Sequence, residues 1–153
     1  MKGGTKLHIK QIDELKPSTF KYIESEIYSY HETVKHIELI EYEIEHSTTN
    51  NHDENTNVGK NSVRANISPV ERKVTALLEH KQLKRMYSIT DAIKKIYERL
   101  DDDKKKLMNL YYWERPGELT WEGIAKECNI GRMTALRWRK QIVYAIAHEL
   151  GER

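Results

Sequence analysis

Several residue types are scarce in this chain of 153 residues, and each scarcity excludes a class of protein. The single cysteine, Cys128, excludes an internal disulfide and fits a reducing cytoplasm. We find no apolar run long enough to span a bilayer and no secretory leader, so we expect a cytoplasmic protein that does not bind a membrane. Only 7 Gly and 3 Pro occur, and alternating β-branched runs bounded by turn dipeptides are missing. Together these features predict an all-α fold.

The motifs of common enzymes and metal sites are missing as well. The sequence has no His-Glu-x-x-His pattern, no Gly-rich phosphate loop and no pair of cysteines. His31 and His36 do not share a helix face, and His46 with His52 matches no established ligand spacing. The acidic run at 101–103 fits the start of a helix, where carboxylates complement the helix dipole. We therefore expect no enzyme, no catalytic residue, no metal and no cofactor.

Charge is nearly balanced overall, at +2, but it is unevenly distributed. Residues 1–57 contain 6 Lys/Arg and 11 Asp/Glu, whereas residues 58–153 contain 20 and 13. A polyanion would be repelled by the acidic front and attracted by the basic rear. Ordinary surface solvation is the other explanation of this asymmetry, so it does not identify a partner by itself.

The stretch 119–146 has the pattern of a helix-turn-helix. Thr120 can cap a short helix, Asn129 tolerates the left-handed conformation of a tight turn, and Gly131 begins a second helix. Helices joined by so short a turn cross steeply, so a small residue is needed where they approach, and Ala125 is in the right place. The apolar residues of the second helix recur at steps of three and four and are Ala135, Trp138, Ile142 and Ala145.

The other side of this second helix is basic, because no Asp or Glu occurs between Glu127 and Glu149. Arginine reads guanine edges through two parallel hydrogen bonds, which suits Arg132 and Arg137. A basic amphipathic helix that only packs on its neighbour is the alternative. Arg139 and Lys140 are expected to take phosphates, and Met133 and Leu136 to meet thymine methyl groups. The candidate DNA-binding residues are Thr120, Arg132, Met133, Thr134, Leu136, Arg137, Arg139 and Lys140.

Two motifs carry a resemblance to known proteins. The helix Lys-Lys-Leu-Met-Asn-Leu-Tyr-Tyr-Trp precedes the run Thr-Trp-Glu-Gly-Ile-Ala-Lys-Glu-Cys-Asn-Ile-Gly, and this segment resembles region 4 of bacterial sigma factors. The whole chain, with its Ile-Tyr-Ser-Tyr-His-Glu segment and its Glu-Leu-Gly end, resembles the RinA-type phage transcriptional activators. The resemblance implies promoter binding, activation of phage or prophage late genes and contact with bacterial RNA polymerase. Gly131 departs from the pattern, because such motifs usually carry a capping Ser there.

We expect four segments along the chain. These are a helical dimerisation or partner-binding segment at 1–46, a flexible polar linker at 47–67, a long helix at 68–100 and the helix-turn-helix domain at 101–153. In the first segment, a helical stretch is expected at 6–15, and Pro17 marks a boundary. The resemblance to RinA-type proteins implies a further turn near Ser29 and Tyr30. A seam at a spacing of about 3.5 residues is formed by Phe20, Ile23, Ile27, Tyr30, Val34 and Ile37, and Ile44 rejoins it. This seam fits either a coiled coil that binds a second chain or an intramolecular helical pair.

The long helix has a sharp start at Ser68, Pro69 and Glu71, which form a capping box. It either continues to Leu100 or breaks after Ser88, where Thr90 offers a second cap. An unbroken helix exceeds the span of a small domain, so part of it should project or pair with another chain. Its apolar stripe comprises Val74, Leu77, Leu78, Met86, Ile89, Ile93, Ile96 and Leu100.

The aromatic residues near the helix-turn-helix are expected to build its core. Leu107, Leu110 and Tyr111 should pack against it, whereas Tyr112 can reach solvent. Two of the three tryptophans, Trp121 and Trp138, should hold the two-helix unit together, with a stacking platform for single-stranded bases as the alternative. The sequence thus favours a regulator that binds double-stranded DNA over a helical adaptor that binds another protein through residues 20–44. The regulator could act as a monomer or as a homodimer.

Overall fold

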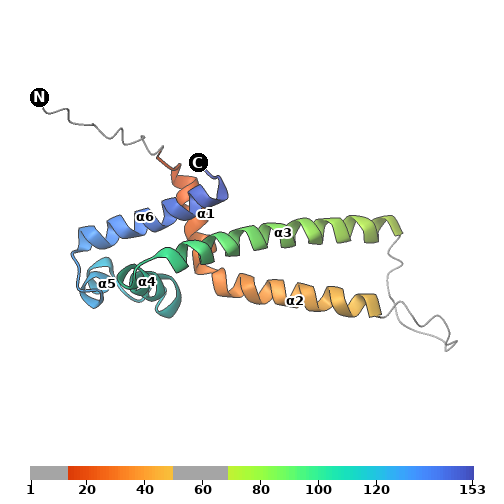
Figure 1. The fold of residues 1–153 in the computed structure, drawn as a ribbon, viewed down its shortest axis with the longest axis horizontal. Coiled ribbons are helices and arrows are strands. Elements are labelled where there is room, and N and C mark those ends of the chain that lie inside the picture. Colours follow the sequence, from red (N-terminus) through yellow and green to blue (C-terminus); the bar gives the residue numbers. More distant parts are fainter. Residues whose placement is uncertain (1–13, 50–68) are drawn as a thin grey trace, which may run out of the picture. The chain divides into compact units, whose positions relative to one another are not determined.

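The computed structural model describes residues 14–49 and 69–153. Its elements in chain order are α1 (Pro17–Tyr28), α2 (Tyr30–Thr49), α3 (Pro69–Arg99), α4 (Asp102–Met108), the π-helix η2 (Asn109–Glu114), α5 (Trp121–Glu127) and α6 (Arg132–Leu150) (Figure 1). This confirms the predicted all-α fold. None of the helices in the described ranges combines the length and the apolar character needed to cross a membrane.

The chain divides into two compact units whose boundaries differ from the expected segments. One unit joins the front of the chain, up to Ser25, to residues 101–153, and the other comprises residues 26–100. Helix α1 therefore belongs largely with the helix-turn-helix, although the sequence suggested a separate module at 1–46. The helical stretch expected from residue 6 lies almost entirely outside the described residues, as do Ser68 and most of the expected linker. Residues 47–49, which we assigned to that linker, continue α2.

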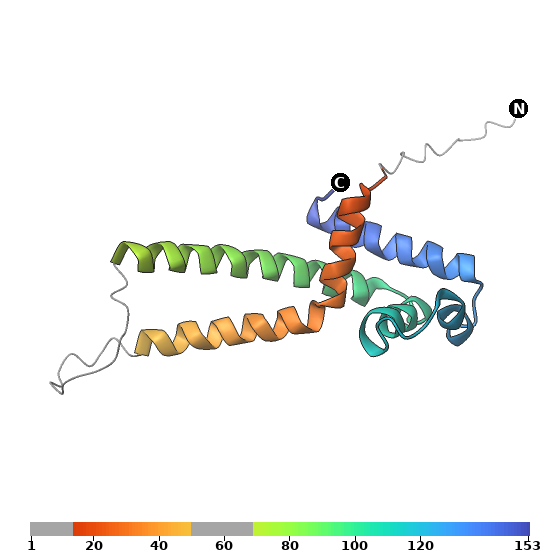
Figure 2. The same cartoon turned by 180° about the vertical axis from the view of Figure 1, so that it is seen from behind.

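In the second unit, α2 and α3 run side by side as a helical pair, as Figures 1 and 2 both show. The chain turns at Ser29, as predicted, and the Ser29 carbonyl accepts a 2.8 Å hydrogen bond from the Thr33 backbone N–H. Ile27 and Ile37 of the expected seam are buried, and Val34 is half-buried. Of the two explanations of the seam, the structure supports the intramolecular helical pair.

Helix α3 is continuous from Pro69 to Arg99, and the break considered in its middle does not occur. Thr90 does not cap a new helix, because its hydroxyl donates back to the carbonyls of Met86 and Tyr87, at 2.9 and 3.2 Å. A separate helix starts only after Asp101, whose carboxylate accepts the Lys104 backbone N–H at 2.9 Å, as expected of the acidic run. Lys104 Nζ also donates to this carboxylate at 2.6 Å, and the side-chain and backbone hydrogen bonds from Lys104 lower the pKa of Asp101.

Candidate nucleic-acid interface

Helix α5 is the first helix of the helix-turn-helix, and it begins as predicted. The Thr120 hydroxyl accepts a 3.2 Å hydrogen bond from the Gly123 backbone N–H and so caps the helix. Ile124 and Ala125 are buried on its inner face. The Thr120 hydroxyl is thus used to cap α5, and this role explains why a threonine stands here without any contact to nucleic acid.

The turn between α5 and α6 has the geometry that its residues predict. Asn129 adopts a left-handed conformation with φ 54°, and the backbone N–H of Ile130 donates to the Ala125 carbonyl at 2.9 Å. Cys128 is buried beneath this turn, as expected for a core residue. Gly131 takes the extended N-cap conformation before α6 and supplies no side-chain cap, because glycine has no side chain to offer.

The inner face of α6 closes the core of the first unit. Ala135 and Ile142 are buried, as predicted, and the fully buried stripe continues to the end of the helix through Val143, Ile146 and Ala147. Helices α5 and α4 both pack against α6. Two other helices therefore pack against the inner face of α6, and its opposite face is left exposed.

Most of the candidate DNA-binding residues lie on this outer face. Arg132, Arg137 and Lys140 are exposed, and the side chain of Met133 is 72% exposed. The half-buried candidates on the edges of the face are Thr134 and Leu136. We name the exposed set Arg132, Met133, Arg137 and Lys140 the outer face of α6.

Arg139 is a correction to the predicted site. Its guanidinium forms two hydrogen bonds with the Glu24 carboxylate, Nε to Oε1 and Nη2 to Oε2, each 2.6 Å long. The Tyr112 hydroxyl donates a third, at 2.8 Å, to Glu24 Oε1. The Glu24 residue is only 9% exposed, so this ion pair is part of the core and not a phosphate contact.

Aromatic rings surround the Arg139 guanidinium. Its central carbon lies 5.1 Å from the ring centroid of Phe20, 5.3 Å from that of Trp121 and 5.8 Å from that of Tyr111. Rings at this distance attract a cation through their negative faces. The hydrogen bonds to Glu24 raise the pKa of Arg139 further above its ordinary value. Arg139 thus joins α1 to η2, α5 and α6.

Tyr112 is a second correction, because it is 1% exposed where the sequence suggested solvent. Tyr112 follows the fully buried Met108 by four residues, so the two side chains lie on the same face of the helix. Tyr112 lies within the π-helix η2, in which the backbone N–H of Arg115 donates to the carbonyl of Leu110, five residues back, at 3.3 Å. Its hydroxyl finds an acceptor in the interior, the Glu24 carboxylate. Burial, and then the neighbouring Glu24 carboxylate, raise the pKa of Tyr112.

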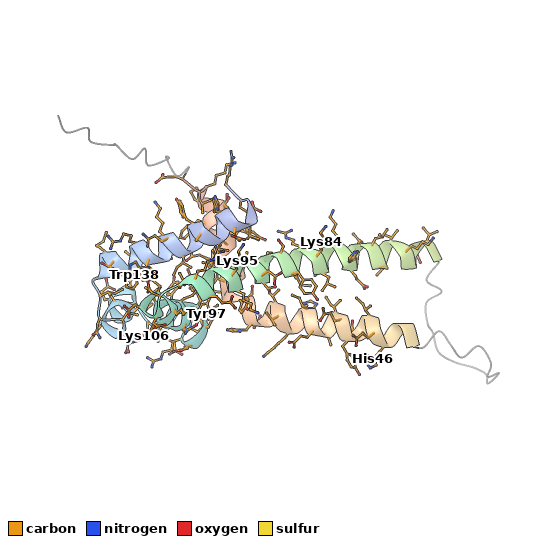
Figure 3. All side chains as sticks on the ribbon, viewed as in Figure 1. His46, Lys84, Lys95, Tyr97, Lys106 and Trp138 are labelled. Carbon is orange, nitrogen blue, oxygen red and sulfur yellow. The ribbon has the colours of Figure 1, made fainter. Side chains whose placement is uncertain are left out.

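The two indoles each contact the segment that precedes the helix-turn-helix. The ring of Trp121 lies 4.3 Å from that of Tyr111, centroid to centroid, and Lys104 Nζ lies 5.2 Å from the centroid of Trp138. Figure 3 labels Trp138 on α6, and both indoles are half-buried. Each indole thus packs one helix of the motif against the preceding segment, and this packing does not favour a stacking platform for bases. That the indoles hold α5 and α6 to each other stays a prediction.

Two cations of the outer face have exposed acidic neighbours. Arg132 Nε lies 2.7 Å from Glu122 Oε1, and Lys140 Nζ lies 3.4 Å from Glu14 Oε1. The hydrogen bond to Glu14 raises the pKa of Lys140, so this amine stays charged. Exposed pairs of this kind contribute little to stability, so both cations can exchange their carboxylate for another anion.

Comparison with known proteins gives one match. No curated protein and no solved structure matches the chain. A family model described as a protein of unknown function (DUF722) matches residues 19–148. The matched residues begin within α1 and end within α6, so they include the Glu24–Arg139 pair and the outer face of α6. The chain therefore belongs to the DUF722 family of proteins of unknown function.

Proposed function

We propose that this chain is a transcriptional regulator that binds double-stranded DNA sequence-specifically through α6. The observation that carries the proposal is the outer face of α6, where Arg132, Arg137 and Lys140 are exposed on a helix braced by α4 and α5. A major groove admits one α-helix, and helix-turn-helix proteins place the N-terminal part of their second helix there. No acidic residue interrupts α6 before Glu149, so the reading half of α6 carries no negative charge of its own.

The exposed side chains divide into base-reading and phosphate-binding roles. Arg132 and Arg137 carry planar guanidinium groups that can pair with the O6 and N7 atoms of guanine. Lys140, one turn further on, is assigned to a phosphate, which fixes the position of the helix but carries no sequence information. Met133 provides the most exposed apolar contact for a thymine methyl group. Arg139 has a different role here, because its pairing with Glu24 holds the helix in place.

The biological setting is proposed from resemblance. The likeness of 101–150 to sigma factor region 4, and of the whole chain to RinA-type activators, supports activation of phage or prophage late genes in a bacterial cytoplasm. Promoter DNA and the host RNA polymerase are the implied partners. A helix-turn-helix by itself serves activators and repressors alike, so the resemblance alone favours an activator.

The test is selection of genomic DNA fragments by the purified full chain, followed by sequencing and quantitative binding to the selected duplex. Arg137→Ala should weaken binding to that site by about 1–3 kcal/mol, because it removes a bidentate contact with a base. Lys94→Ala, which removes an exposed cation from α3, serves as the matched control and should leave the affinity unchanged. Equal losses on selected and random duplexes would reduce Arg137 to a phosphate contact.

Salt provides a second measurement on the same complex. The logarithm of the affinity should fall linearly with the logarithm of salt concentration, with a slope of about −0.9 for each phosphate neutralised. Lys140→Ala should reduce this slope by about one such step on specific and random duplexes alike. Retention of no fragment together with a flat salt response would exclude the proposed function.

A helical adaptor is the second candidate, and the exposed apolar side chains of the second unit favour it. The seam first suggested for it is largely internal, since Ile27 is fully buried. Leu77 is 68% exposed and is therefore the better probe. The adaptor is the better description if Leu77→Asp abolishes capture of a specific protein partner and Arg137→Ala changes no measurable property.

A further inference from the structure

An ion pair joins the first turns of the two helices of the helix-turn-helix. Glu122 lies in the first turn of α5, Arg132 is the first residue of α6, and Arg132 Nε is 2.7 Å from Glu122 Oε1. The packing of α5 against α6, and the hydrogen bond from the Ile130 N–H to the Ala125 carbonyl, hold the two backbones in place. The carboxylate is therefore presented to Arg132 from a fixed position.

This contact uses one part of the Arg132 guanidinium and leaves another part available. A guanidinium carries five N–H donors in a rigid, planar fork, and Nε supplies one of them. Guanine is read through two parallel hydrogen bonds to its O6 and N7 atoms. Arg132 can therefore keep Glu122 on Nε and offer its two terminal nitrogens, Nη1 and Nη2, to one guanine. It need not release its partner in order to bind a base.

Arg137, the other arginine assigned to base reading, provides an internal comparison. Among residues 14–49 and 69–153, Arg137 has no hydrogen-bond or ion-pair partner, so its long side chain can change rotamer. Such freedom is lost when a side chain binds, and the loss weakens the contact. A side chain that is held in advance loses less, and a fixed pair of donors also fits one pattern of acceptors better than others. Of the two arginines, Arg132 is therefore the better oriented for one base.

The charge of Glu122 acts in the opposite direction. A hydrogen bond from its own backbone N–H, together with Arg132 and the Thr120 hydroxyl, lowers the pKa of Glu122, so this carboxylate stays ionised. An exposed negative charge beside the outer face of α6 weakens the attraction of any phosphate, whatever the base sequence. Glu122 should therefore reduce the affinity for random DNA while it improves the discrimination made through Arg132.

We propose that Glu122 is a positioning residue for Arg132 and thereby determines specificity at one G·C base pair. Glu122 binds Nε and holds the guanidinium so that Nη1 and Nη2 meet the O6 and N7 atoms of a guanine. The inference rests on the proposed function, because it concerns how the same DNA-binding site selects its sequence. Glu14 has a different role, since it pairs with Lys140, which is assigned to a phosphate and reads no base.

Quantitative binding of the full chain to three kinds of duplex tests the proposal. These are the selected duplex, duplexes in which each G·C pair of that site is replaced in turn, and a random duplex. Glu122→Ala should reduce the discrimination at one G·C pair roughly tenfold, because an arginine that is not held fits that pair and its replacement more equally. Its affinity for the random duplex should rise about twofold, because a negative charge is removed.

Glu118→Ala is the matched control, because it removes another exposed carboxylate that precedes α5 and has no ion pair with the outer face of α6. It should leave the discrimination at every base pair unchanged. A purely structural role of Glu122 would instead lower the affinities for the selected and the random duplex by the same factor, and that result would overturn the proposal.

Combination with the arginine variants shows whether Glu122 acts through Arg132. Arg132→Ala should relax the same G·C pair, and adding Glu122→Ala should then cause no further loss of discrimination. In the Arg137→Ala background the full loss should remain. Unchanged discrimination in Glu122→Ala, or an equal loss with and without Arg132, would exclude the positioning role while sequence-specific binding by the unmodified chain still stands. If the unmodified chain selects no sequence, the proposed function fails and this inference fails with it.

Discussion

The two units of this molecule differ in how completely each buries its own apolar side chains. Residues such as Leu107, Met108, Ile142 and Ile146 of the first unit are fully buried, and Met133 is its single large apolar residue that is exposed among those described. The second unit leaves apolar side chains in solvent on both of its long helices, Val70, Val74, Leu77 and Leu78 on α3 and Leu39, Tyr42 and Ile44 on α2. Apolar burial is therefore nearly complete in the first unit and incomplete in the second.

Charge follows the same division. The first unit places Arg139 and Glu24 in its interior, with every oxygen of the carboxylate hydrogen-bonded, and keeps its other α6 cations outside. In the second unit, Lys84 and other cations remain on the exposed sides of α3. An internal ion pair requires precise packing around it, because unpaired buried charge is costly. We therefore expect substitutions to affect stability strongly in the first unit and weakly at the exposed end of the second.

Paired truncations give the largest expected contrast. Ile142→Ala should lower the free energy of unfolding by about 2–5 kcal/mol, because it opens a cavity in a closed core. Leu78→Ala should lower it by less than about 0.5 kcal/mol at protein concentrations where the chain is monomeric, because its side chain is already in solvent. Urea denaturation of both variants measures the two values. Comparable losses would contradict the distinction between the units.

Removal of the buried carboxylate should have the next largest effect. Glu24→Ala leaves the Arg139 guanidinium without its partner and the Tyr112 hydroxyl without its acceptor, and it should lower the free energy of unfolding by about 3 kcal/mol. Glu14→Ala removes the partner of Lys140, but that carboxylate is 84% exposed, so the unfolding midpoint should not move. If the two substitutions have equal effects, the Glu24–Arg139 pair is no part of the core.

The dependence of the free energy of unfolding on alkaline pH tests the same cluster of Glu24, Tyr112 and Arg139. Burial raises the pKa of Tyr112 in the folded chain above the ordinary tyrosine value of 10.0, so the unfolded chain loses the proton first. The contribution of Tyr112 is therefore complete below pH 10 and declines as the pH rises beyond that value, by up to about 1.4 kcal/mol per pH unit. Tyr112→Phe should remove this part of the alkaline slope in urea titrations. An identical slope in the variant would show that Tyr112 does not keep its proton.

The smallest expected effect is an increase in the free energy of unfolding, caused by a substitution in the first unit. Gly123 lies inside α5, and an added Cβ would meet Leu119 Cδ2 at 3.5 Å, an ordinary contact. Gly123→Ala should raise the free energy of unfolding by up to about 1 kcal/mol, because alanine restricts the unfolded chain more than glycine does. Thermal unfolding measures it, and Gly117→Ala is the opposed control, since its φ of 77° disfavours a side chain. Destabilisation by Gly123→Ala would mean that α5 needs this glycine for close packing.

Features controlled by neighbouring residues could be read from the sequence. Thr120, Asn129 and Asp101 each act through hydrogen bonds or backbone conformations within a few residues, so the two helices of the motif and the start of α4 were predicted correctly. The turn at Ser29 was also predicted correctly, but from the resemblance to RinA-type proteins and not from neighbouring residues. The exposed positions of Arg132, Arg137 and Lys140 also follow from helical periodicity once the apolar stripe is known.

The role of Glu24 could not be predicted, although one signal was present. Glu24 shares a helix face with Phe20, Ile23 and Ile27, and a carboxylate on an apolar face needs a buried partner. Nothing in the sequence says which of many cations supplies it. The partner, Arg139, lies 115 residues further along the chain.

The sequence by itself determined that this protein is helical, where the helix-turn-helix lies and that its second helix is basic, because these properties depend on composition and on spacings of a few residues. Only the tertiary structure decided which cations remain outside, because Glu24 takes Arg139 into the core. It also decided that Tyr112 turns inward, because the acceptor of its hydroxyl, Glu24, lies 88 residues away along the chain. Finally, it showed that α3 keeps one half in contact and exposes the other, since burial depends on which helices come to lie beside it.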